Sequence, residues 1–185
     1  KNEINELGGY VILKNKRFIL AADVGSNPIK NYSSDYQAGV LSFEIFSNGK
    51  KLITNCGYFS DKKNKLNKLS RSTALHSTLN IEDFSSCNFI RKDKNFIIDK
   101  GCKITKKNII FENDYWKIEG AHDGYFQKFN TIHERRFEFY PNQMKFIGYD
   151  KLLRKNPYKK IKFDIRFHLN PGSKVMKTQD NKSIL

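Results

Sequence analysis

Residues 34–60 read SDYQAGVLSFEIFSNGKKLITNCGYFS, and this stretch decides the fold class. Leu41, Phe43 and Ile45 alternate with the polar residues Ser42 and Glu44. An Asn48-Gly49 pair follows, and then a second strand-like run, Leu52-Ile53-Thr54. Alternation places successive side chains on opposite faces of a strand. An Asn-Gly pair favours the tight turn that joins two antiparallel strands, so the stretch predicts a β-hairpin.

Similar strand-like runs recur along the chain. Residues 8–25 predict a second hairpin that turns near Asn15-Lys16, residues 60–72 a charged loop, and residues 73–81 a strand after a short turn. Further strands are predicted in the runs NFIID, CKITKKNIIFENDYWKIEG, TIHERRFEFY, QMKFIGYDKLL and KIKFDIRFHLNPG. The connectors are rich in Asn, Asp, Gly and Lys, which suit hairpin turns. No stretch keeps the apolar spacing of a helix, so helices should be few and short.

Many short strands with frequent turns favour a sandwich over a parallel sheet. We therefore expect one domain across residues 1–185, an all-β antiparallel β-sandwich. The chain starts at Lys1 rather than at Met, already in a strand-like run. We expect it to be a piece of a longer protein.

The chain is strongly basic, with 34 Lys+Arg against 19 Asp+Glu and a net charge of +15. Such a charge favours an acidic partner, which is nucleic acid, an anionic glycan or an anionic membrane face. The alternative is compositional, because Lys, Asn, Ile and Phe are all abundant and the lysines are scattered. No helix-turn-helix, zinc-finger or aromatic RNA-binding motif occurs, so nucleic acid is the less favoured partner. No apolar run reaches the length of about 18 residues that spans a membrane.

Three cysteines, Cys56, Cys87 and Cys102, occur without a Cys-x-x-Cys pair. An odd number at these wide spacings supports neither a zinc site nor a disulfide framework. Buried thiols are the favoured interpretation, and one disulfide in an oxidising compartment stays open.

The segment AHDGY places a histidine, a carboxylate and a tyrosine in one predicted tight turn. Asp123 could orient the His122 imidazole, and Tyr125 follows two residues later. The alternative is a turn that the Asp123 side chain stabilises through its own backbone.

The run TIHERRFEFY places His133 and Arg135 on the same strand face as Phe137 and Phe139. Aromatic rings that end in His and Arg suit a sugar-binding surface, where Arg holds a carboxylate or a sulfate. Equally, the two phenylalanines are core and only the end of the strand is wet.

In FDIRFHLNPG, the same alternation places Asp164, Arg166 and His168 on one face. This polar row could line a groove. The favoured interpretation is an ordinary solvent-facing row of charges.

The segment LSRSTALHSTL separates Arg71 from His76 by small and hydroxyl residues. This spacing leaves room for a ligand beside the two side chains. The residues by themselves do not specify which ligand.

Taken together, these segments resemble the C-terminal β-sandwich domain of the heparinase II/III-like family of polysaccharide lyases. AGVLSFEIFSNGKKLITNCG is similar to the strand pair of the family, and RSTALHSTL to its Arg-x-Thr-x-x-His-x-Thr-Leu segment. AHDGY, HERRFEF, GYDKL and RFHLNPG follow in the order of the family. The resemblance runs from about Gly9 to Gly172.

The resemblance implies an N-terminal helical toroid and a sugar chain bound between the toroid and the sandwich. It also implies β-elimination on a uronic acid. A cationic or polar group neutralises the carboxylate, a base removes the C5 proton, and an acid protonates the departing O4. In the family, most of these groups lie on the toroid. The sandwich adds a histidine and, in some members, a zinc site of two His and one Asp.

Alignment on Ser42-Phe43 places Asp35 at the catalytic histidine, Gln37 at a zinc-binding histidine and Asn55 at the zinc-binding aspartate. Only His76 matches the third zinc ligand. Carboxamides are poor zinc ligands, and one histidine cannot hold the ion. We therefore predict no metal and no other cofactor.

We predict the sandwich domain of a lyase that cleaves acidic, uronate-containing polysaccharides, with the sandwich alone inactive. The alternative is a non-catalytic module that binds an anionic glycan or the cell envelope. Catalytic roles are predicted for His76 and His122. Substrate binding is predicted for Arg71, Gln37, Tyr125, His133 and Arg135. If the resemblance holds, Arg71 and His76 should border the sugar groove and face solvent; the alternative is a structural role, with His76 buried and bonded to backbone. The expected partners are an acidic polysaccharide and the protein's own N-terminal helical domain, in the periplasm or cell envelope, with the cytoplasm left open.

Overall fold

The computed structural model describes residues 2–93, 95–155, 160–176 and 178–179. One sheet contains β1 (Glu3–Leu7), β2 (Tyr10–Lys14), β3 (Phe18–Asp23), β4 (Phe43–Ser47), β5 (Lys50–Thr54) and β14 (His168–Leu169). A second contains β9 (Ile104–Phe111), β10 (Trp116–His122), β11 (Thr131–Tyr140) and β12 (Lys145–Arg154). Two small sheets pair β6 (Leu79–Ile81) with β13 (Phe163–Ile165), and β7 (Asn88–Lys92) with β8 (Asn95–Lys100). The helical elements are α1 (Lys65–Ser70) and α2 (Phe126–Phe129) with the 3-10 turns η1 (Lys30–Tyr32), η2 (Thr73–Leu75) and η3 (Pro141–Gln143).

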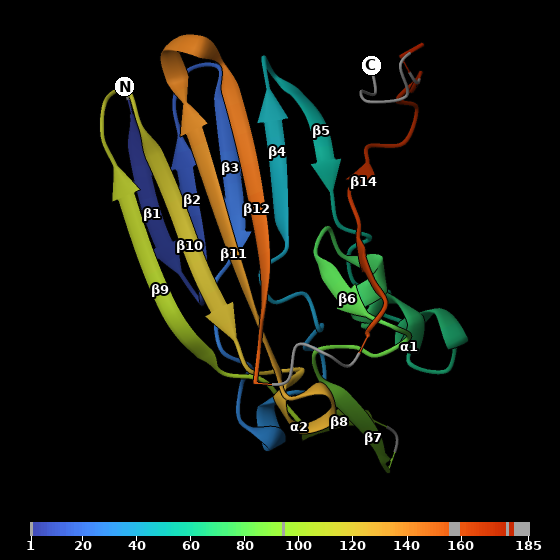
Figure 1. Cartoon of the computed structure of the whole chain (residues 1–185). Helices are drawn as coiled ribbons and strands as arrows, with labels where there is room; N and C mark the ends of the chain where they lie inside the picture. The colour runs from blue at the N-terminus through green and yellow to red at the C-terminus, as the bar shows by residue number, and fades with distance from the viewer. Residues whose placement is uncertain (1, 94, 156–159, 177, 180–185) are drawn as a thin grey trace.

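The two large sheets face each other across a shared core (Figure 1). The first runs in the order β1-β2-β3-β4-β5-β14 and the second in the order β12-β11-β10-β9, with antiparallel pairing throughout. The prediction of an all-β antiparallel sandwich with few, short helices is confirmed. Among the described residues, no helix is long and apolar enough to cross a membrane.

Both predicted hairpins are present. β2 and β3 turn at Asn15, whose side-chain oxygen accepts the backbone N–H of Arg17 and of Phe18 at 2.9 and 2.8 Å. β4 and β5 turn at Asn48 and Gly49, which have φ angles of 49° and 76°. Asn and Gly tolerate this left-handed conformation, and so the sequence indicates the turn.

β11 connects the apolar core to the polar interior of the domain. It buries every second residue, so its inward face begins with Thr131, His133 and Arg135 and ends with Phe137 and Phe139. The two phenylalanines meet aromatic side chains of the facing sheet: Phe139 stacks on Phe18 with ring centroids 3.8 Å apart, and Phe137 lies 4.6 Å from Phe43. Burying such rings stabilises the sandwich by roughly 1.5–3 kcal/mol each. The same packing carries the His133 and Arg135 side chains inward.

Two local predictions need correction. The charged loop predicted for residues 60–72 contains α1, because the Asn64 side chain accepts the N–H of Leu66 at 3.0 Å and caps the helix. The strand predicted for residues 73–81 is present only as β6, and η2 occupies its first third.

The run KIKFDIRFHLNPG was expected to form one strand, and this expectation is wrong. β13 pairs with β6, whereas β14 pairs with β5 in the six-stranded sheet. The chain therefore passes from one sheet to another between Ile165 and His168, and the row of Asp164, Arg166 and His168 on one strand face does not form. Arg166 Nη1 and His168 Nε2 instead lie 3.4 and 3.1 Å from the Ala74 carbonyl oxygen.

The aromatic core gives a test of the packing. Phe43 is 1% exposed, and its ring lies within contact of Phe137, Phe146 and Phe167. Because Phe43→Ala leaves a cavity between the sheets, we expect it to lower the free energy of unfolding by about 3–5 kcal/mol in a denaturant titration. The control Leu52→Ala removes a side chain that is 45% exposed and should cost less than about 1 kcal/mol. Equal losses from the two variants would contradict this core.

Candidate functional site

The predicted site residues form two polar groups. The Gln37 group contains Gln37, Arg71 and His76 together with Asn55. The His133 group contains His122, Tyr125, His133 and Arg135 together with Asp150. The two groups meet at Ser77, whose N–H donates to Asn55 Oδ1 at 2.7 Å and whose carbonyl accepts Arg135 Nη1 at 2.9 Å.

In the Gln37 group, a histidine and a carboxamide join two loops. His76 Nδ1 lies 2.9 Å from the Ser72 carbonyl oxygen, and Nε2 lies 3.1 Å from Gln37 Oε1. Burial lowers the pKa of His76, so the ring is neutral and carries one proton. That proton is on Nδ1, because a carbonyl can only accept. His76 is 3% exposed and bonded to a backbone carbonyl, so its ring does not face solvent and the alternative of a structural, buried histidine is the one found.

The neutral ring also fixes the orientation of the Gln37 carboxamide. His76 Nε2 is an acceptor in this tautomer, so the Gln37 NH2 must face it and donate. This orientation gives Gln37 Nε2 a partner, which it otherwise lacks among the described residues. The two loops are therefore joined by one neutral hydrogen bond.

Asn55 follows β5 and is fixed from three sides. Its Oδ1 accepts the Ser77 N–H, its Nδ2 lies 3.4 Å from Ser42 Oγ, and its backbone N–H donates to Glu44 Oε1 at 2.9 Å. The side chain thus ties the end of β5 to the segment that follows His76.

Gln37, Asn55 and His76 occupy the three positions at which the family resemblance implies a zinc site. They offer one imidazole and two carboxamides, and carboxamides are weak ligands for zinc. The Asn55 oxygen is already used by the Ser77 N–H. Within the described part of the chain, no cluster of three or more His, Cys, Asp or Glu side chains could hold a metal ion. These residues do not fit zinc, and the hydrogen bond between Gln37 and His76 links their two loops instead.

Arg71 lies at the C-terminal end of α1 and is 1% exposed. Its guanidinium donates to the carbonyls of Ser33, Tyr36 and Phe96 at 2.7, 2.8 and 2.7 Å. It also lies over the Phe89 ring, 4.3 Å from the centroid. The expectation that Arg71 faces solvent is wrong, because a planar fork of five donors can satisfy several buried carbonyls at once.

The His133 group contains a chain of hydrogen bonds with a defined direction. The Gly124 N–H donates to His122 Nδ1 at 3.1 Å, which places the proton of a neutral His122 on Nε2. His122 Nε2 lies 3.1 Å from His133 Nδ1, and His133 Nε2 lies 2.6 Å from Asp150 Oδ1. Burial lowers the pKa of both histidines, that of His122 well below its ordinary value. Each proton therefore points toward Asp150, and every donor has an acceptor.

Arg135 binds the same carboxylate. Its Nε and Nη2 donate to Asp150 at 2.7 and 2.9 Å, and its Nη1 donates to the carbonyls of Leu41 and Ser77 at 3.1 and 2.9 Å. Burial would raise the pKa of Asp150, but the hydrogen bonds from His133 and Arg135 outweigh burial and bring it to about 2. Asp150 is a carboxylate at any physiological pH.

Tyr125 is also enclosed. It is 1% exposed, its hydroxyl donates to the Leu79 carbonyl at 2.9 Å, and its ring lies 5.4 Å from His122. The structure thus brings the four predicted residues of this group together inside the domain. All four side chains are buried, and their hydrogen bonds hold the surrounding strands and loops together.

Sequence reasoning missed two residues of the interior. Asp150 lies opposite Arg135 in the register of β11 and β12. The short turn between these strands was the available signal, since it fixes which residues face each other. Ser77 acts through its backbone and through its hydroxyl, which donates to the Thr54 carbonyl at 2.7 Å and accepts the His168 N–H at 3.0 Å. The backbone part of this role leaves no signal in the sequence.

The exposed rim next to the Gln37 group carries Asp35, Tyr58 and Lys62. The Tyr58 hydroxyl donates to Asp35 Oδ1 at 2.8 Å, and Lys62 Nζ lies 3.3 Å from the same oxygen. The Tyr58 hydrogen bond lowers the pKa of Asp35, with a smaller contribution from Lys62. The ionised carboxylate is a poor proton acceptor.

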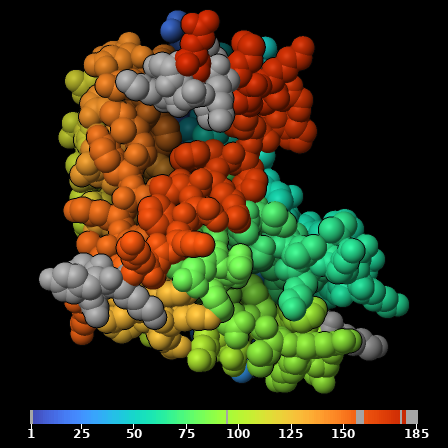
Figure 2. Space-filling view, turned by 45° about the vertical axis from the view of Figure 1, so that its right-hand side comes forward, coloured from blue at the N-terminus to red at the C-terminus, as the bar shows by residue number. Residues whose placement is uncertain are grey.

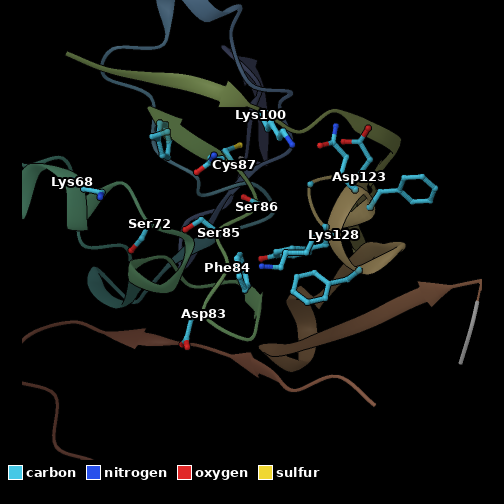
Figure 3. A pocket seen from close by; sticks show the side chains of 18 residues that line it. Lys68, Ser72, Asp83, Phe84, Ser85, Ser86, Cys87, Lys100, Asp123 and Lys128 are labelled. Carbon is cyan, nitrogen blue, oxygen red and sulfur yellow. The ribbon is translucent and has the colours of Figure 1, made fainter. Parts of the chain in front are cut away.

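A pocket of about 760 Å³ lies between β7, β8 and α2 (Figure 3). Its lining combines phenylalanine rings with exposed amines and two carboxylates: Phe84, Phe89, Phe126, Phe129; Lys68, Lys100, Lys128; Asp83, Asp123. Lys128 Nζ lies 2.8 Å from the centroid of the Phe84 ring. Rings beside amines suit an anionic sugar, because a ring can stack on the sugar face while an amine pairs with its carboxylate or sulfate.

The model of the family described as Heparinase II/III-like, C-terminal matches residues 6–185. The chain belongs to this family. The heparan sulfate lyase HepC from Pedobacter heparinus has a TM-score of 0.71 at 18% identity, with 99% of this chain and 26% of that chain covered. Heparinase III has a TM-score of 0.65 at 20% identity, with 100% and 27% covered. At these identities the likeness shows the fold.

A relative is found among characterised proteins as well. FtsZ-localized protein C of Caulobacter vibrioides is 26% identical over 177 residues, which cover 89% of this chain and 30% of that protein. The chain thus spans less than a third of the length of each of these three relatives. The chain is therefore similar to only one part of each relative.

The three carbonyls around Arg71 predict that this arginine cannot be replaced by lysine. An ammonium group on a thin stem cannot reach all three oxygens, so Arg71→Lys should lower the free energy of unfolding by about 2 kcal/mol or more. The matched control is Arg91→Lys on β7, because the Arg91 side chain is exposed. This change should alter the free energy of unfolding by no more than about 0.5 kcal/mol. Chemical denaturation of both variants measures the difference. A small loss for Arg71→Lys would contradict the role of the guanidinium.

The donor set at Gln37, Asn55 and His76 predicts that zinc does not bind. Elemental analysis of the purified protein should find well under one zinc ion per chain. A chelator should leave the melting temperature unchanged, because no metal holds the loops. Stoichiometric zinc would show that these residues bind the metal after all.

The buried neutral histidines predict that acid destabilises the fold. His122 and His133 have folded-state pKa values below the ordinary 6.5, so only the unfolded chain takes up their protons as the pH falls below that value. Stability should drop by up to about 1.4 kcal/mol per pH unit for each histidine. Asp23 acts in the opposite direction, because burial raises its pKa to about 7.

The measurement therefore uses Asp23→Asn beside the wild type, with denaturant titrations from about pH 7.5 to about pH 5. Asp23→Asn should lose stability steeply over this range, and the wild type less steeply. A flat profile for Asp23→Asn would mean that the histidines are charged in the folded protein.

Proposed function

We propose that this chain is the sandwich domain of a polysaccharide lyase that cleaves acidic, uronate-containing glycans by β-elimination. The observation that carries the proposal is membership of the heparinase II/III-like family over residues 6–185. Two structural neighbours with matching folds are a heparan sulfate lyase and Heparinase III. The net charge of +15 agrees with a polyanionic substrate.

The sandwich contributes binding and positioning in this proposal. Lys62 on the exposed rim pairs with a sugar carboxylate, and Gln37, whose carboxamide is bonded to His76, holds the loop beside this rim. His76 positions Gln37 through the hydrogen bond between them. His122 has both ring nitrogens engaged inside the domain, so its predicted catalytic role is not carried forward.

The base that removes the C5 proton and the acid that protonates O4 then come from a helical domain elsewhere in the full-length protein. The family resemblance implies a catalytic histidine where this chain has Asp35, and the lowered pKa of the Asp35 carboxylate makes it a weak base. The sandwich alone should bind the glycan without cleaving it.

The test is incubation of the full-length protein with alginate, heparan-type and other uronate glycans. We expect unsaturated uronate ends, detected by their ultraviolet absorbance, for at least one of them. Lys62→Ala should lower kcat/KM about tenfold, equal to about 1.4 kcal/mol. The control Lys145→Ala, an exposed lysine at the start of β12, should leave it unchanged. No unsaturated product from any glycan would overturn the proposal.

A second candidate function is a non-catalytic module that binds anionic glycans or the cell envelope. It is favoured by Asp35 and Gln37, where the family resemblance implies histidines, and by the pocket of rings and lysines in Figure 3. The relative from Caulobacter vibrioides is named for its localisation with FtsZ and not for a reaction. Binding on a glycan array that Lys128→Ala weakens, with no unsaturated product, would favour this function over the lyase.

The periplasm or cell envelope is the proposed location, and it rests on the family resemblance alone. Fractionation of cells that produce the full-length protein tests it. Recovery in the cytoplasmic fraction only would contradict it.

A further inference from the structure

We propose that Cys87 and Cys102 form a covalent modification site, a dithiol that low-molecular-weight disulfides oxidise to an intramolecular disulfide. The proposal concerns the β7–β8 hairpin and does not depend on the lyase reaction.

The two thiols meet at the base of this hairpin. Cys87 directly precedes β7 and Cys102 follows β8 by two residues, beside the strand pair Asn88 and Lys100. The sulfur atoms lie 3.5 Å apart, and both residues are buried, with 2% and 1% exposure. A disulfide needs a sulfur separation of about 2 Å, so each side chain has less than one bond length to move.

The two cysteines are both buried and differ in their position relative to the pocket. Cys87 lines the pocket of Figure 3, where its side chain is labelled between Ser86 and Lys100. Cys102 lies under the turn before α2, where a Cβ placed on Gly124 would be 3.0 Å from the Cys102 Cβ. A reagent that enters the pocket therefore reaches Cys87 first.

The pKa shifts of the two thiols also make Cys87 the first to react. The hydrogen bond with Cys102 is the main cause that lowers the pKa of Cys87, and the same contact with burial raises the pKa of Cys102. Since a thiolate is the attacking species, Cys87 is the nucleophile and Cys102 is the thiol that resolves the intermediate.

The reaction balances in two exchanges. Cys87 thiolate attacks a disulfide such as oxidised glutathione, forms a mixed disulfide, and releases one glutathione thiolate. Cys102 then loses its proton and attacks the Cys87 sulfur, so the protein disulfide forms and the second glutathione leaves. Two electrons pass from the cysteines to the reagent, and the two thiol protons end on the two released glutathiones.

The new bond would close a hairpin that holds the interior together. The Phe96 carbonyl accepts from Arg71 at 2.7 Å, and the Ile98 N–H donates to Ser33 Oγ at 2.9 Å. The disulfide restricts the unfolded chain across the whole hairpin. It should therefore raise the melting temperature of the protein.

The test treats the folded protein with oxidised glutathione, unfolds it, and alkylates the remaining thiols with N-ethylmaleimide. Of the three cysteines, only exposed Cys56 should end with a maleimide or a glutathione. Apart from the adduct on Cys56, the protein should be lighter by two hydrogen atoms. Peptide mapping should join Cys87 to Cys102, and the melting temperature should rise. Cys87 and Cys102 both alkylated after this treatment, or either one joined to Cys56, would overturn the proposal.

Variants separate the two roles. Cys102→Ser should trap a glutathione on Cys87, because nothing resolves the mixed disulfide. Cys87→Ser should leave Cys102 unmodified, because the pocket does not reach it. Cys56→Ser is the matched control and should form the internal disulfide like the wild type. If Cys56→Ser does not form the internal disulfide, the proposal is overturned. This outcome does not depend on whether the Cys87 and Cys102 variants fold.

Discussion

The buried guanidinium of Arg135 is the interaction on which the rest of the structure depends. It binds the Asp150 carboxylate through two nitrogens and donates through the third to the carbonyls of Leu41 and Ser77. One side chain thereby ties the four-stranded sheet to the loop before β4 and to the segment after η2. A charge in this interior is tolerated only because each of its three nitrogens donates to a partner, and the carboxylate neutralises it. Gln37 and His76 meet because these two loops are held in place.

Arg71 supports the same loops from their other side. It holds Ser33 and Tyr36 while Arg135 holds Leu41, so the segment that carries Gln37 is pinned at both ends. This explains how the domain can keep its loop arrangement with residues that do not fit zinc. Two buried arginines and a neutral hydrogen bond supply the links.

Much of the fold could be predicted from the sequence, because alternation and turn residues act locally. The hairpin around Asn48 and the face shared by His133, Arg135, Phe137 and Phe139 follow from a period of two alone. The sequence could not predict whether the His133 and Arg135 end of that face points to solvent or into the domain. His and Arg suit a solvent-filled groove and a buried, fully hydrogen-bonded position equally well. The deciding partner, Asp150, lies on another strand. The break between β13 and β14 could not be predicted for a similar reason. Each of these strands pairs with a different sheet, and the alternating pattern of the sequence does not indicate which strands pair.

A double-mutant cycle between Arg135 and Asp150 tests the central claim most directly. The variants Arg135→Met, Asp150→Leu and their combination are compared by the free energy of unfolding in denaturant. Each single change leaves an unpaired buried charge and should cost about 3–5 kcal/mol. The double variant should cost less than the sum of the two by at least about 1 kcal/mol, because it leaves neither charge behind. Small single losses, or losses that simply add, would contradict a fold that is organised around this pair.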